Sequence, residues 1–136
     1  MKTLLDHLRR TGDLETVSKP VDPTFQLAAI TRQVQKAGDK AVLFNRVGDS
    51  TFPVISNLYG SHRRLCDIIG AGEQTFCQRW NTLTAEAASA STAECLVPFE
   101  GVDDFVAGAL SDLPPISYPA RDGGPYFTSA IYLAND

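Results

Sequence analysis

The sequence predicts an α/β fold (α+β) in which a small mixed β-sheet is flanked by helices. The chain has 136 residues, of which 43% are hydrophobic and 21% charged, and this is enough apolar material for one core. Stretches of helical periodicity alternate with short apolar runs along the chain. One of these runs, Ala41–Phe44, is continuously apolar, as in a strand covered on both faces, and it is predicted to be the central strand.

The first elements are a short helix and a short strand. Near the N-terminus, helical spacing is seen in the apolar residues Leu4, Leu5 and Leu8, which predicts a helix. This helix is predicted to end at Gly12. Leu14 and Val17 then alternate with polar residues until Pro20, which predicts a strand.

The second helix is predicted to begin at Asp22-Pro23. The Asp22 side chain is expected to cap the free backbone N–H groups, and Pro23 suits the first helical position because it has no N–H to satisfy. One apolar face follows, made of Leu27, Ile30 and Val34. Ala37-Gly38-Asp39 is predicted to end this helix before the central strand begins.

Further along, Phe52–Ile55 predicts a second strand after the Gly48 turn. Ser61 is expected to cap a helix that ends at Gly70. A longer helix is marked by Phe76, Trp80, Leu83 and Ala87. The tail of that helix, residues 85–93, consists almost entirely of Ala, Ser and Thr; a linker is favoured there over a helix end.

The last third predicts one helix and one strand. Val102 to Leu110 has helical spacing, with Asp103 and Asp104 in the first turn. Residues 126–133 alternate as a two-sided strand whose aromatic pattern suggests a partner surface. The glycine-rich segment 119–127 fits an ordinary tight turn, or a turn that delivers this strand to a ligand or domain boundary.

Charge and cysteine content exclude several classes of protein. The net charge is −4, and residues 81–136 hold eight acidic side chains against the single base Arg121, so no nucleic-acid partner is expected. No apolar run approaches the roughly 18 residues of a membrane span, so no membrane is expected as partner. The three cysteines form neither a disulfide framework nor a Cys-x-x-Cys half-site, which favours a reducing, cytoplasmic location.

Few residues show a pattern that indicates chemistry. Cys66 and Cys77 fall on apolar helix faces and are predicted to pack in the core, and His7 is predicted to be solvated. The segment 60–64, Gly-Ser-His-Arg-Arg, opens a helix after a strand and could receive an anion, although a cap followed by exposed basic residues is favoured. No serine lies in a nucleophile elbow, and the adjacent Asp103 and Asp104 diverge by about 100° on a helix.

Six blocks in one order resemble the N-terminal region of the UbiD family. They are Leu8-Arg9-Arg10-Thr11-Gly12-Asp13-Leu14, Val21-Asp22-Pro23, Ala41-Val42-Leu43-Phe44-Asn45, Phe52-Pro53-Val54, Asn57-Leu58-Tyr59-Gly60-Ser61, and Leu113-Pro114 followed by Asp122-Gly123-Gly124-Pro125-Tyr126. The resemblance covers nearly all of the chain. One departure is Gln26, where family members commonly carry Glu.

The resemblance implies an enzyme far longer than this chain. Members of the family are reversible decarboxylases (carboxy-lyases) of aromatic, heteroaromatic and α,β-unsaturated acids that use prenylated FMN with Mn²⁺ and often K⁺. It implies that residues 1–113 are the N-terminal α/β domain and residues 114–136 a linker and the first strand of a flavin-binding split barrel. The catalytic and metal-binding residues would lie beyond this chain, and the only matches near the cofactor would be Ser129 and Thr128. Expected partners are the remaining flavin-binding and C-terminal domains, in a homo-oligomer when full length.

Three hypotheses of function therefore stay open at the level of sequence. The first is the N-terminal domain of a UbiD-like decarboxylase, inactive by itself and without cofactor or metal of its own. The second is a non-catalytic interaction module or small subunit that binds a partner through the strand at 126–133. The third is an anion-binding regulator that uses Ser61 to Arg64.

Overall fold

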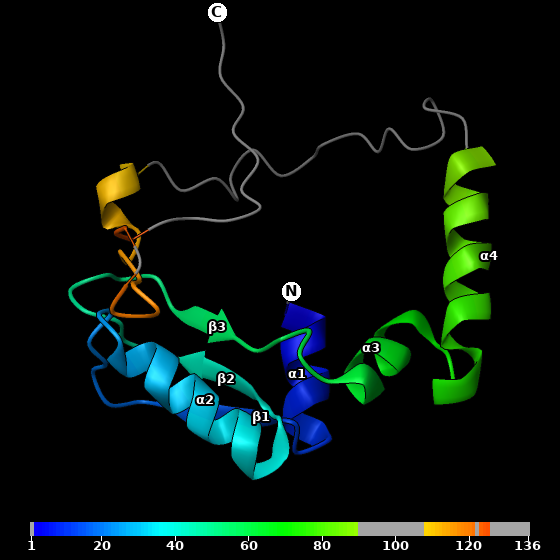
Figure 1. The fold of residues 1–136 in the computed structure, drawn as a ribbon, viewed down its shortest axis with the longest axis horizontal. Helices are drawn as coiled ribbons and strands as arrows, with labels where there is room; N and C mark the ends of the chain where they lie inside the picture. Colours follow the sequence, from blue (N-terminus) through cyan, green and yellow to red (C-terminus); the bar gives the residue numbers. More distant parts are fainter. Residues whose placement is uncertain (1, 90–107, 122, 126–136) are drawn as a thin grey trace, which may run out of the picture. The chain divides into compact units, whose positions relative to one another are not determined.

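The computed structural model describes residues 2–89, 108–121 and 123–125, which belong to two units. The first unit comprises residues 1–58 and 109–136, and the second comprises residues 59–108. Within the described residues, the first unit contains α1 (Lys2–Arg10), β1 (Leu14–Val17), α2 (Gln26–Gly38), β2 (Ala41–Phe44), β3 (Val54–Ser56) and the 3₁₀ helix η3 (Leu110–Asp112) (Figure 1). The second contains α3 (His62–Ile69), the 3₁₀ helix η1 (Glu73–Thr75) and α4 (Phe76–Ser89).

The sheet of the first unit is mixed, and β2 is its central strand. The order is β1-β2-β3, with β1 parallel and β3 antiparallel to β2. Phe44 is opposite Val17 on one side and Val54 on the other. The predicted fold class and the predicted central strand are both confirmed.

Each face of β2 contributes to a different hydrophobic cluster. Val42 and Phe44 pack with α2 in one cluster, and Ala41 packs with α1 in the other. All four residues of β2 are buried, and three of them have no exposed surface. Because successive side chains of a strand point to opposite faces, a strand between two helices is apolar throughout. This explains the continuous apolar run seen in the sequence.

The helix predicted to start at Asp22-Pro23 begins three residues later than Pro23, at Gln26. The Asp22 carboxylate accepts a hydrogen bond from the backbone N–H of Thr24 at 2.7 Å, so it closes a local turn and does not cap the helix. The residue before α2 is Phe25, which has the left-handed φ of 67°. The prediction was wrong at this end because the same side-chain oxygen suits a turn and a helix cap equally well.

The second predicted strand is also displaced. Phe52 donates its N–H to the Ser50 hydroxyl at 3.2 Å and belongs to the turn, so β3 starts at Val54. Pro53 has no N–H with which to extend the ladder towards the turn.

In the second unit, Ser61 caps α3 as predicted, and Gly70 ends it with a φ of 67°. α4 continues to Ser89, so the first residues of the segment predicted as a linker, 85–89, are helical. The prediction was wrong here because alanine is the best helix former and small residues are compatible with either state. Of the helix predicted from Val102, only residues 108–110 are described, and Leu110 begins η3. The predicted strand at 126–133 and residues 90–93 lie outside the described residues. In the described part of the chain, no helix has the length and apolar character needed to cross a membrane.

Candidate functional site

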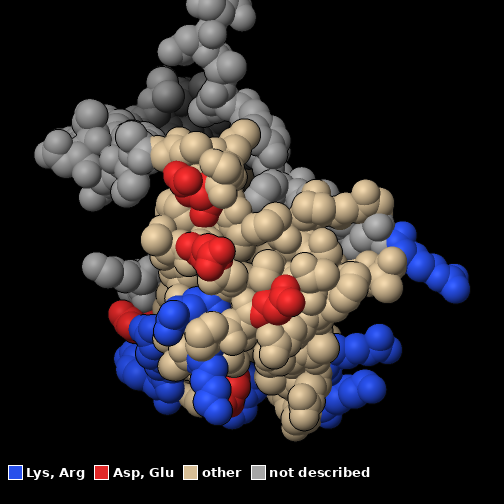
Figure 2. Space-filling view, turned by 90° about the vertical axis from the view of Figure 1, so that its left-hand side faces the viewer, with Lys and Arg blue, Asp and Glu red and all other residues tan. Residues whose placement is uncertain are grey.

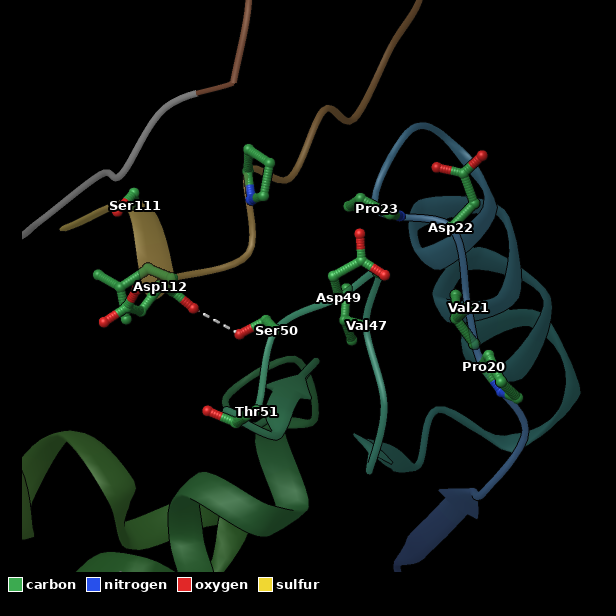
Figure 3. Close-up of a pocket in the computed structure, with 13 residues that line it drawn as sticks. Pro20, Val21, Asp22, Pro23, Val47, Asp49, Ser50, Thr51, Ser111 and Asp112 are labelled. Atoms are coloured by element: carbon green, nitrogen blue, oxygen red, sulfur yellow. Dashed lines mark hydrogen bonds between the residues drawn. The ribbon is translucent and has the colours of Figure 1, made fainter. Parts of the chain in front are cut away.

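A groove of about 920 Å³ with three walls lies in the first unit and is seen in close-up in Figure 3. One wall is the segment between β1 and α2, the second is the turn between β2 and β3, and the third is the segment around η3. Its lining residues are Pro20, Val21, Asp22, Pro23, Val47, Gly48, Asp49, Ser50, Thr51, Ser111, Asp112, Leu113 and Pro115.

The first two walls are joined by backbone hydrogen bonds. Val21 and Val47 form a parallel bridge, and the Gly48 N–H donates to the Val21 carbonyl at 2.9 Å. Gly48 has a φ of 55°, and a Cβ at this position would lie 3.4 Å from Cδ of Pro23. The tight turn therefore favours glycine for its left-handed backbone, whereas the contact with the proline ring is of ordinary van der Waals length.

The third wall comes from far along the sequence. The Ser50 hydroxyl donates to the Asp112 carbonyl oxygen at 2.7 Å, the bond drawn in Figure 3. Further on, the Ser117 N–H donates to the Pro23 carbonyl at 3.1 Å, and the Phe25 N–H donates to the Ser117 carbonyl at 3.0 Å. These backbone bonds hold the segment that follows η3 against the turn that precedes α2. The first wall is therefore paired with the second wall through Val21 and with the third through Pro23.

The groove is acidic. Its lining includes Asp22, Asp49 and Asp112 and no Lys or Arg, and no ion pair given for the described residues involves these three carboxylates. Figure 3 shows the Asp49 carboxylate projecting between the two outer walls. Figure 2 shows acidic side chains spaced along the upper part of one face of the molecule and Lys and Arg gathered at its lower part. A groove of this charge favours cationic groups and disfavours phosphates and carboxylates.

The groove does not match the requirements of the cofactor and metal that the resemblance implies. Across the described ranges there is no group of three or more His, Cys, Asp or Glu residues that could hold a metal ion. A flavin phosphate needs cationic or N–H donors, and the lining lacks cationic side chains. The groove therefore does not suit a flavin phosphate, and the described residues hold no cluster suited to a metal ion.

The site residues predicted from the resemblance, Ser129 and Thr128, lie outside the described residues and stay predictions. Cys95, Asp103 and Asp104 also lie outside the described residues.

The basic segment at the start of α3 differs from its predicted form. Arg64 is only 2% exposed, so it is not one of two exposed cations. Arg63 is exposed and lies 3.5 Å from the carboxylate of Asp67 one turn along the helix. Ser61 accepts the N–H of Arg64 through its hydroxyl. The segment is thus a capped helix start with one buried guanidinium, and it does not present the pair of surface cations that the anion-binding hypothesis needs.

A cysteine and a histidine meet on α3, at a spacing of four residues that sequence reasoning overlooked. The Cys66 sulfur lies 3.9 Å from Nε2 of His62, and the His62 ring lies against that of Phe76 with centroids 5.2 Å apart. Burial raises the pKa of the Cys66 thiol, and the carboxylates of Glu73 and Asp67 act in the same direction. The thiol is therefore held in its protonated form, which is the opposite of what a nucleophilic cysteine requires.

The other cysteine prediction was half right. Cys66 is buried as predicted, whereas Cys77 is exposed on α4. The structure buries no residue of α4, so its apolar positions do not mark a core face within the described residues. His7, predicted to be solvated, is half-buried.

Sequence reasoning did not identify the groove, although a signal was present. Two of the blocks that resemble the UbiD family, Val21-Asp22-Pro23 and the block beginning with Leu113, supply opposite walls. Their common location appears only after folding, because about ninety residues separate them. Nothing in the pattern indicated that Phe25 would adopt a positive φ.

Residues 5–84 match the family model UbiD_N, described as the N-terminal domain of 3-octaprenyl-4-hydroxybenzoate carboxy-lyase. A protein of Rhodospirillum rubrum, described as an uncharacterised protein in the cooM 5′ region, is 32% identical over 136 residues, covering 98% of this chain and 29% of that protein. An uncharacterised protein of Chlamydia trachomatis is 40% identical over 65 residues, covering 48% of this chain and 11% of the relative.

Solved structures agree with the family match. The UbiD-class enzyme HmfF from Pelotomaculum thermopropionicum, in an evolved dimeric form in complex with prenylated FMN, superposes with a TM-score of 0.67 and 26% identity, covering 91% of this chain and 29% of HmfF. A complex of HmfF with FMN gives the same TM-score. The fold is shared by vanillic acid decarboxylase of Sedimentibacter hydroxybenzoicus in open form. The two chains are 24% identical with a TM-score of 0.50, and the match covers 62% of this chain and 18% of the decarboxylase chain. The chain thus spans less than a third of the length of these relatives.

Proposed function

Because the chain belongs to the UbiD family, whose N-terminal domain its residues 5–84 match, we propose that it serves as the N-terminal domain of a UbiD-like carboxy-lyase. The parent activity would be the decarboxylation, or the reverse carboxylation, of aromatic, heteroaromatic or α,β-unsaturated acids. The observation that carries the proposal is the likeness to HmfF, which extends over 91% of this chain at a TM-score of 0.67.

The catalytic residues, in this proposal, lie in sequence that the chain does not contain. Prenylated FMN would act as the electron sink for the carbanion that decarboxylation develops. The acidic lining of the groove supports this division of labour, since it does not suit an anionic cofactor or substrate. The domain would instead support and flank a flavin-binding domain.

The proposal includes the domain limits expected from the sequence. Residues 1–113 would form the N-terminal domain, and residues 114–136 would lead into the flavin-binding domain, with Ser129 and Thr128 near the cofactor. The partners would be the flavin-binding and C-terminal domains of the parent enzyme, in a homo-oligomer. Mn²⁺ and K⁺ would be held by those other domains, and the location would be cytoplasmic.

A chimera tests the proposal. The part of HmfF that this chain matches is replaced by residues 1–136, and HmfF lacking that part serves as the control. We expect the chimera to retain prenylated FMN after desalting and to release CO₂ from the substrate of HmfF, and the shortened control to do neither. The 136-residue chain alone, supplied with prenylated FMN and Mn²⁺, is expected to retain no flavin.

Two results would contradict the proposal. Turnover of an aromatic acid by the 136-residue chain alone would place the catalytic residues within it. The chimera could also show the native far-UV circular dichroism of its parts but neither keep the flavin nor decarboxylate the substrate of HmfF. That result would show that the chain is not an N-terminal domain of this kind.

A further inference from the structure

Large apolar side chains are exposed near the groove. In the described part of the first unit these are Phe25 and Tyr118, each 43% exposed, and Leu110, which is 70% exposed. Thr24 and Ser117, their chain neighbours, form a parallel bridge, so Phe25 and Tyr118 follow paired positions. Leu110 begins η3, which contributes Ser111 and Asp112 to the groove. Exposed large apolar side chains on the segments that form a groove are typical of an interaction surface.

The backbone holds Phe25 in an unfavourable conformation. Its φ of 67° is uncommon for any residue but glycine, asparagine or aspartate, and least suited to a bulky side chain. Three hydrogen bonds maintain the segment: Phe25 N–H to the Ser117 carbonyl at 3.0 Å, Ser117 N–H to the Pro23 carbonyl at 3.1 Å, and Ala29 N–H to the Phe25 carbonyl at 2.9 Å. The fold thus places an aromatic ring at the surface at some energetic cost.

The occupant of this surface follows from length and charge. HmfF continues well beyond the 29% of its chain that this chain matches, so the family supplies a large polypeptide that such a domain has to contact. The groove beside the aromatic residues is lined by Asp22, Asp49 and Asp112 without a cationic residue. A partner that presents arginine or lysine to the groove and apolar groups to the rings would be complementary in both respects.

We propose that Phe25, Tyr118, Leu110 and the acidic groove together form the surface on which the remaining part of a UbiD-class polypeptide docks, with a basic segment of that part in the groove. This inference rests on the proposed function, because it assumes that the domain works within such a polypeptide. It adds the location of the contact and the chemistry of its partner.

Hydroxyl-radical footprinting tests the proposal, because aromatic side chains are oxidised readily when solvent reaches them. The isolated 136-residue chain and the HmfF chimera are compared. We expect oxidation of Phe25 and Tyr118 to fall severalfold in the chimera. Ile68, which is also 43% exposed but lies on α3 of the second unit, is the internal control and should change less than twofold.

A glycine variant separates docking from folding. Glycine adopts a positive φ without strain, so Phe25→Gly removes the ring without disturbing the backbone. In the Phe25→Gly chimera we expect Tyr118 oxidation to return towards that of the isolated chain, while the unfolding midpoint of the isolated variant stays unchanged or rises. Raising the salt concentration should increase Tyr118 oxidation in the chimera, and less so in an Asp49→Asn chimera, because screening weakens the contact with a basic segment.

The outcomes distinguish this inference from the proposed function. An active chimera in which Phe25 and Tyr118 are oxidised as fast as in the isolated chain would overturn the docking surface and leave the proposed function intact. Protection that develops in the isolated chain as its concentration rises would assign the surface to a second copy and also overturn it. A chimera that neither binds flavin nor decarboxylates would remove both.

Discussion

Replacing Asn57, which follows β3, is expected to destabilise the first unit. Its amide N–H₂ donates to the Asp39 carboxylate and to the Lys40 carbonyl, each at 2.9 Å, and its oxygen accepts from the Gln35 side chain at 2.8 Å. Its φ is 55°, a value that asparagine tolerates better than alanine does. The side chain thus links the end of α2 and the start of β2 to the end of β3.

The expected magnitudes follow from these contacts. At a net stabilisation of roughly 1 kcal/mol per hydrogen bond, and less for the exposed bond to Gln35, Asn57→Gly is expected to lower the free energy of unfolding by about 2 kcal/mol. Asn57→Ala should cost about 3 kcal/mol, because alanine adds left-handed strain. In a unit of this size, 2 kcal/mol lowers the unfolding midpoint by roughly 8–16 °C. Asn57→Asp should be at least as damaging at neutral pH, since it places a carboxylate beside that of Asp39.

Urea unfolding followed by far-UV circular dichroism measures these differences, since the tryptophan at position 80 reports only on the second unit. The control is Asn45→Ala, because the Asn45 side chain makes one long hydrogen bond, of 3.4 Å to Ser18, and its loss should cost less than about 0.5 kcal/mol. Equal stability of Asn57→Ala and the unmodified protein would refute the reasoning.

Four further predictions concern the core, the groove and the cysteines. Phe44→Ala, at a position with no exposed surface, should lower the free energy of unfolding by about 3–5 kcal/mol in urea titrations, and a loss below about 1 kcal/mol would contradict the packing described for β2. Gly48→Ala should cost about 1–2 kcal/mol, because its φ of 55° penalises any Cβ; an unchanged unfolding midpoint would contradict this turn geometry. Mass spectrometry after brief alkylation should find Cys77 labelled well before Cys66, and the order would be reversed if Cys66 were the reactive thiol. Because burial raises the pKa of Cys66, the stability of the fold should fall as pH rises above the ordinary thiol value of about 8.5, and a Cys66→Ala variant should lack this fall.

Predictions from the sequence were most accurate where a local pattern had a single physical solution. The continuous apolar run of β2 was read as a strand covered on both faces, and Val42 and Phe44 pack on one side while Ala41 packs on the other. Ser61 and Gly70 were placed at the two ends of α3, because a capping hydroxyl and a left-handed glycine are strong local signals.

Errors arose where one residue type suits two structures. Asp22 closes a turn with Thr24 instead of capping α2, and the alanine-rich residues 85–89 are helical instead of forming a linker. The candidate site was harder still to predict. Neither the burial of Arg64 nor the outward ring of Phe25 has a signature in the spacing of residues.

The amino-acid sequence by itself determined the element types, the central strand, the acidic character of the second half and the resemblance to the UbiD family. Only the tertiary structure decided that Asp22, Asp49 and Asp112 line one groove and that Phe25 and Tyr118 follow paired backbone segments. The physical reason is the range of the interactions. Caps, turns and periodicity act between residues a few positions apart, whereas the hydrogen bond from Ser50 to the Asp112 carbonyl spans 62 positions and exists only once the core has formed.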